Sequence, residues 1–146
     1  MSLILASLAE KKIEDWNLYP KTFEDGEKFA RQMDIRLIYD EIKSRGEYTV
    51  YKKISFIVLK KNLNARWRSW VLWHEIGHHL LHYPGTYLFT PSAARKVDFE
   101  ANFVSAIALL PTNLFTIMTH SEIMAEFGYT KKLVEFRQKI WDHFKI

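Results

Sequence analysis

The sequence predicts an α+β fold, with helices first, then a small antiparallel sheet of about three strands, then further helices. Apolar residues recur at helical spacing in the first third of the chain and again beyond residue 65. Between residues 35 and 61 the pattern changes to short runs of β-branched and aromatic residues. The chain has 146 residues without a linker or an internal repeat, so we expect residues 1–146 to form a single domain.

The N-terminal third is expected to contain two helices. Residues 3–16 carry apolar side chains at helical spacing, and Pro20 separates them from a second helix over residues 22–33. Glu24 and Asp25 fall in the first turn of that second helix. Acidic side chains at this end interact favourably with the helix dipole, which supports a start at Thr22.

Three short segments, IRLIYD, EYTVYKK and ISFIVLKK, are expected to form the sheet. Ser44, Arg45 and Gly46 supply the turn between the first two segments. The last two segments form either a tight hairpin or one long bent strand. Residues 62–64 then end the strand and can cap a helix that begins near Ala65.

The second half of the chain is predicted to be helical with one long loop. The first helix runs from about residue 65 to 83, and the loop YPGTYLFTPS follows, in which two prolines and a glycine interrupt regular helix. Helix resumes over about residues 93–110 and is ended by Pro111. A final helical region spans about residues 121–144, with a break at Gly128.

Composition excludes several classes of protein. There is no cysteine, which excludes a disulfide framework, a thiolate zinc finger and a cysteine nucleophile, and leaves His, Asp and Glu as metal ligands. Apolar runs are far shorter than the roughly 20 residues that cross a bilayer, and the start lacks the basic region of a secretory signal. We therefore predict a soluble, cytoplasmic protein with no membrane contact. The net charge of +4 is scattered, which does not favour direct nucleic-acid binding.

The segment WVLWHEIGHHLLHY contains His74, Glu75 and His78 as H-E-x-x-H within a predicted helix. Residues four apart point the same way, so both imidazoles can bind one metal ion, while Glu75 lies about 100° further round the helix. The face that carries the histidines is otherwise apolar, and Gly77 allows another segment to approach closely. The alternative is a buried helix whose histidines make ordinary hydrogen bonds. Two histidines one turn apart beside a glutamate favour the metal.

A catalytic zinc site needs a third protein ligand and an open position for water. The elongated motif of the metzincins is excluded, because Leu81 and Pro84 stand where it requires glycine and histidine. His82 lies one turn beyond His78, but three ligands along one straight helix cannot surround an ion. We interpret His82 as an outer or structural residue.

Glu100 is the candidate third ligand. On the helix over residues 97–110 it falls on the apolar face, where a buried carboxylate needs a cation, and the metal held by His74 and His78 would supply one. The alternative is a buried salt bridge to an arginine or lysine. Asp98 falls on the polar face and is interpreted as facing solvent or as accepting a hydrogen bond from a ligand imidazole.

Two motifs also carry a resemblance to a known family. HEIGHHLLH, a loop and then FEANFVSAIALLP resemble the ImmA/IrrE family of small metallopeptidases, whose pattern is H-E-x-G-H, then E-A-[DN]-x-F-A and a closing L-L-x-P. Nearly the whole chain fits, with one departure at Val104-Ser105. The resemblance implies a minimal zincin-like fold of the gluzincin type, zinc on His74, His78 and Glu100, and Glu75 as catalytic base.

The resemblance also implies a substrate. Known members cleave helix-turn-helix repressors of phages, integrative elements or stress regulons. We therefore predict a zinc-dependent endopeptidase that cleaves one helix-turn-helix repressor and so acts as an anti-repressor, in a stand-alone form because residues 1–34 show no helix-turn-helix pattern.

Two other functions are alternatives to proteolysis. A metal-containing regulatory protein could sequester its partner without proteolysis, but only proton transfer requires Glu75. A DNA-binding protein with a structural metal would depend on the net charge alone. The sequence leaves the oligomeric state open, and also the donor that stabilises the oxyanion, for which Tyr83, Tyr87 and His79 are the candidates.

Overall fold

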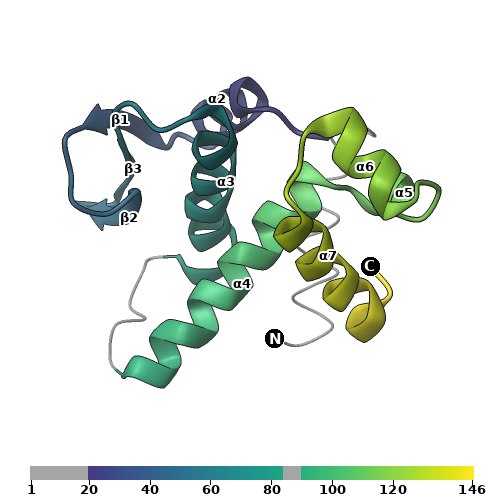
Figure 1. Ribbon diagram of the computed structural model, residues 1–146. Coiled ribbons are helices and arrows are strands. Elements are labelled where there is room, and N and C mark those ends of the chain that lie inside the picture. Colours follow the sequence, from purple (N-terminus) through teal and green to yellow (C-terminus); the bar gives the residue numbers. More distant parts are fainter. Residues whose placement is uncertain (1–19, 84–89) are drawn as a thin grey trace.

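The computed structural model describes residues 20–83 and 90–146. Over these ranges it contains six helices and a sheet of three strands, which confirms the α+β class. Helix α3 (Ala65–His82) is central: the sheet lies on one side of it and helix α4 (Pro91–Leu109) crosses its other side (Figure 1). Within the described ranges, no helix combines the length and apolar character that crossing a membrane requires.

Helix α2 (Phe23–Gln32) begins where the sequence predicts. Its cap is reciprocal: the Thr22 hydroxyl accepts a hydrogen bond from the Asp25 amide, and the Asp25 carboxylate accepts one from the Thr22 amide. The buried side of α2 includes Phe29, whose ring lies against that of Trp73 on α3. The helix expected over residues 3–16 lies outside the described residues.

The sheet consists of β1 (Arg36–Asp40), β2 (Gly46–Tyr51) and β3 (Ile54–Lys60), in the order β1-β3-β2. β2 and β3 are antiparallel as expected, but β1 pairs with β3 in parallel, so the prediction of a purely antiparallel sheet was wrong for this pair. β3 is the most apolar strand and has the most buried side chains. Its central position shields those side chains from water better than an edge position would.

The connection between β2 and β3 settles the choice between a hairpin and a bent strand. Lys52 and Lys53 form a two-residue turn with φ values of 49° and 66°. Positive φ at both central residues is the geometry of the tightest hairpins, which Asn-Gly or Asp-Gly usually supplies. Two lysines give no such signal, so the sequence could not decide between the alternatives.

The ends of α3 and α4 are fixed by local caps. The Asn64 side chain accepts a hydrogen bond from the Trp67 amide, as the sequence suggests for residues 62–64. Thr90 does the same for the Ala93 amide, and Pro91 occupies the first position of α4, where the missing amide hydrogen is not needed. α4 therefore starts two residues before the position expected.

The C-terminal region packs against the far end of α4 and consists of α5 (Thr112–Phe115), α6 (His120–Phe127) and α7 (Lys131–Phe144). The predicted break at Gly128 is confirmed, with φ of 68°. α5 was not predicted. Arg137 of α7 is fully buried and donates hydrogen bonds to the carbonyl oxygens of Leu110 and Ile146, which ties α7 to the end of α4.

The crossing of α3 and α4 depends on Gly77. A methyl group at this position would lie 3.0 Å from the Ala101 Cα and 3.0 Å from the Val104 Cβ. Both neighbours belong to α4 and both are fully buried, so neither can move without shifting the helix. The sequence-based expectation that Gly77 permits a close approach is confirmed.

Gly77→Ala should therefore destabilise the protein by about 1–3 kcal/mol, the usual cost of overpacking a core. Chemical denaturation in the presence of chelator measures this on the metal-free chain. Arg66→Ala, an exposed substitution on the same helix, serves as the control. Equal stability of Gly77→Ala and the wild type would show that the two helices separate at no cost.

Candidate metal centre

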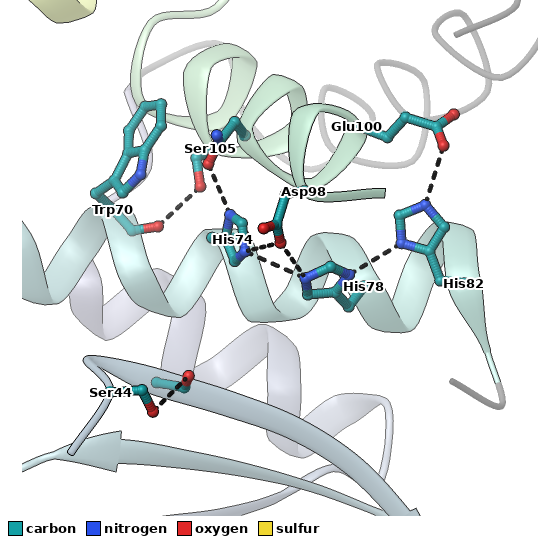
Figure 2. A network of polar contacts seen from close by, with 10 residues as sticks. Ser44, Trp70, His74, His78, His82, Asp98, Glu100 and Ser105 are labelled. Carbon is teal, nitrogen blue, oxygen red and sulfur yellow. Dashed lines mark hydrogen bonds and ion pairs between the residues drawn. The ribbon is translucent and has the colours of Figure 1, made fainter. Parts of the chain in front are cut away.

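Three histidines form a row along α3, on the side that faces α4 (Figure 2). The Nε2 atoms of His74 and His78 lie 3.1 Å apart, and the Nδ1 atoms of His78 and His82 lie 3.0 Å apart. Their spacing of four residues puts them on one face of the helix. The sequence predicted this alignment for His74 and His78, and the structure shows it.

Asp98 on α4 completes a cluster with the first two histidines. Its Oδ1 atom lies 3.5 Å from Nε2 of His74 and 3.5 Å from Nε2 of His78. Its side chain is 64% exposed, whereas that of His78 is only 5% exposed. One half-buried and one buried imidazole nitrogen thus converge with a carboxylate oxygen at the surface, from two helices that cross at Gly77. Among the described residues these three side chains form the group able to hold a metal ion.

The spacing of these atoms fits zinc. Ligand atoms about 2.0–2.1 Å from a tetrahedral zinc ion are about 3.3 Å from one another. The three distances in the cluster, 3.1, 3.5 and 3.5 Å, bracket this value. Two imidazole nitrogens and a carboxylate oxygen are also a donor set that zinc accepts readily.

Burial keeps the two histidines in the form that binds metal. Desolvation lowers the pKa of His78 to about 3, with the nearby imidazoles of His74 and His82 contributing in the same direction. Desolvation is also the main reason that the pKa of His74 is lowered, although Asn102 and Asp98 oppose it. Both rings are therefore neutral at physiological pH, and a neutral imidazole has a nitrogen lone pair for a metal.

Asn102 positions one of these rings. Its Oδ1 atom lies 2.7 Å from Nδ1 of His74. An amide oxygen accepts a hydrogen bond from a protonated Nδ1, which leaves the Nε2 lone pair facing Asp98 and His78. Sequence reasoning placed Asn102 on the polar face of its helix but gave it no role. That face packs against α3, as the hydrogen bond from the Ser105 hydroxyl to the Trp70 carbonyl oxygen also shows.

Glu100 lies elsewhere. It is buried, as the helical pattern predicts, but its Oε1 atom is 3.3 Å from Nε2 of His82, one turn away from the pair formed by His74 and His78. Its Oε2 atom has no hydrogen-bond partner among the described residues. The geometry thus brings Asp98, rather than Glu100, to the two histidines of the motif.

Glu75 is buried on the side of α3 that faces the sheet. Gly46, at the start of β2, lies over it: a methyl group there would be 3.3 Å from Glu75 Oε1 and 2.5 Å from a methyl group of Val71. Burial, followed by the negative charges of Asp98 and Glu47, raises the pKa of Glu75 to about 8. From its sequence context Gly46 is predicted only to lie in a turn, because no sequence pattern shows which glycine makes room for a carboxylate.

The candidates for stabilising an oxyanion differ in their surroundings. His79 Nδ1 lies 2.8 Å from the Tyr48 hydroxyl, which also lies 3.2 Å from the Ser55 hydroxyl. Tyr83 is 53% exposed at the end of α3. Tyr87 lies outside the described residues. Tyr48 was not a sequence candidate, because its place beside α3 depends on the register of the sheet.

Comparison with known proteins adds an independent observation. No curated protein matches the chain significantly. A family profile described as Peptidase_M78, IrrE N-terminal-like domain, matches residues 30–139. This range contains the three strands, both site helices and most of α7. It confirms the resemblance seen in the two motifs, and the chain therefore belongs to the Peptidase_M78 family of IrrE N-terminal-like domains.

Proposed function

We propose that this peptidase is a zinc-dependent endopeptidase in which His74, His78 and Asp98 hold the metal and Glu75 is the general base. The observation that carries this proposal is the convergence of three ligand atoms at the spacing of a zinc site. The adjacent glutamate supports it, because a purely structural or sequestering metal site has no need of a proton acceptor.

The chemistry divides between the metal and the chain. A bound zinc would supply Lewis acidity, which polarises the scissile carbonyl and brings the pKa of a coordinated water to about 7. The charge of a bound zinc ion would favour the ionised form of Glu75, whose carboxylate accepts the proton of the attacking water and passes it to the leaving amine. Asn102 and the buried face of α4 hold the imidazoles in place.

We further propose that the substrate is a helix-turn-helix transcriptional repressor of a phage or mobile element, cleaved in the cytoplasm. The family resemblance supports this substrate class, and the lack of cysteine suits a reducing compartment. A protease of broad specificity would damage a cytoplasm, so recognition of one partner is the expected safeguard. The protein would then act as an anti-repressor.

The test is to mix the zinc-loaded chain with a helix-turn-helix repressor encoded by a neighbouring gene, where the genome has one, together with any required inducer. We expect cleavage at one site, complete inhibition by a chelator, and little activity on casein. Binding without cleavage would instead support a regulatory protein that sequesters its partner. Rapid degradation of unrelated unfolded proteins would contradict the proposed specificity.

A further inference from the structure

Two groups beside the proposed zinc site, one half-buried and one buried, have no part in the ligand set. His82 is the third histidine of the row on α3, and Glu100 is 3% exposed on α4. A buried carboxylate is costly unless hydrogen bonds or a cation stabilise it. The ionisable side chain that contacts Glu100 in the described part of the chain is His82. This pairing requires an explanation in terms of the metal centre.

The contacts form a continuous chain from the site to the buried carboxylate. His78 Nδ1 lies 3.0 Å from His82 Nδ1, and His82 Nε2 lies 3.3 Å from Glu100 Oε1, as the dashed lines in Figure 2 show. His78 uses its other nitrogen, Nε2, toward His74 and Asp98. The carboxylate is thus linked to a proposed metal ligand through one intervening imidazole.

The direction of these hydrogen bonds is fixed by the carboxylate. A neutral imidazole has one N–H donor and one acceptor nitrogen, and a carboxylate only accepts. Glu100 therefore requires the His82 proton on Nε2, which leaves His82 Nδ1 as an acceptor. His78 must then carry its own proton on Nδ1. Its Nε2 atom is left with a lone pair that points at the cluster.

We propose that Glu100 and His82 form a relay that sets the tautomer of His78 and so presents its Nε2 lone pair to the metal. This inference rests on the proposed function. Both are positioning residues that act through His78. The relay corresponds to the carboxylate–histidine–metal arrangements of other metal sites, lengthened here by a second imidazole. For His74 the amide oxygen of Asn102 plays the same part directly.

The relay also accounts for the position of the two carboxylates. Asp98 would contact the metal, while Glu100 lies one imidazole further out. Together their two negative charges equal the charge of a divalent cation. Electrostatic attraction between a buried carboxylate and a nearby cation is strong where water is excluded.

The Glu100→Gln variant tests whether Glu100 acts through the relay or as a direct metal ligand. Glutamine has nearly the same shape, but its amide can donate a hydrogen bond to His82 Nε2. The hydrogen bonds of the relay can then run in the opposite direction, which places the His78 proton on Nε2 instead of Nδ1. Zinc affinity should fall about 10–100-fold, the usual effect of losing an outer partner. His82→Phe should cause a similar loss, and the double variant should lose no more than either single variant, because both act through one chain of bonds.

The second measurement reads the tautomer itself. Nitrogen NMR spectra of the metal-free chain should show the His78 proton on Nδ1 in the wild type and a mixture of tautomers in Glu100→Gln. Circular dichroism checks that each variant folds. If a variant does not fold, the NMR spectrum of the wild type alone tests the predicted tautomer. Glu126→Gln, an exposed substitution on α6, is the control and should change neither zinc affinity nor the spectrum.

Three results would overturn the proposal. The first is a His78 proton on Nε2 in the metal-free wild type. The second is unchanged zinc affinity in both single variants. The third is a loss of zinc affinity that is larger in Glu100→Gln than in His82→Phe, with the two losses adding up in the double variant. A direct metal ligand at Glu100 would behave in that way. A wild-type chain that binds no zinc would instead overturn the proposed function, while its metal-free spectrum would still decide the tautomer.

Discussion

Asp98→Ala should bind zinc at least about a hundredfold more weakly than the wild type, beyond the range expected for loss of an outer partner. The reason is that Asp98 provides the oxygen of the three-atom cluster, and without it two nitrogens on one helix remain. Competition with a chromophoric chelator measures the affinity. Zinc at a hundred times the wild-type Kd should also stabilise the wild type by about 2.7 kcal/mol, and Asp98→Ala far less.

The comparison with Glu100→Ala decides between the two carboxylates. Glu100→Ala should retain zinc more tightly than Asp98→Ala, because Glu100 contacts His82 rather than the histidine pair. Asp142→Ala, an exposed substitution on α7, is the control for a lost charge. Normal zinc binding by Asp98→Ala together with complete loss in Glu100→Ala would return the third-ligand role to Glu100.

Most helices could be predicted because their signals are local. The Thr22 cap, the Asn64 cap and the break at Gly128 each depend on a few neighbouring residues, and all three are present in the structure. The parallel pairing of β1 with β3 could not be predicted in this way. It depends on which strand is stabilised most by burial at the centre of the sheet, and that is determined by packing over the whole sheet.

In the candidate site, too, local features could be predicted from the sequence and contacts between distant segments could not. The alignment of His74 and His78 follows from helical spacing within one segment, whereas the third donor comes from another helix. Helical periodicity placed Glu100 inside and Asp98 outside, and both placements are confirmed. Periodicity does not reveal which turn of α4 lies opposite which turn of α3. The crossing at Gly77 sets that register, and it brings the exposed edge of α4 to the histidine pair.

Glu75→Gln should lower kcat for cleavage of the substrate by about 10²–10⁴-fold, the usual contribution of a general base. Glutamine fills the same space beneath Gly46 but cannot accept the proton of the attacking water. Since Glu75 is not among the three proposed ligands, zinc content and affinity should stay at the wild-type level. Elemental analysis, chelator competition and the rate of repressor cleavage therefore have to be measured on the same preparation.

Glu135→Gln provides the matched control, because it makes the same chemical change at an exposed position on α7 and should leave cleavage and zinc binding unchanged. The two readouts separate the alternatives for Glu75. Loss of zinc along with activity would make Glu75 a ligand or a support for the fold, rather than a base. Full activity with normal zinc would remove it from the mechanism altogether, and with it the argument that this metal centre is built for hydrolysis and not for sequestration.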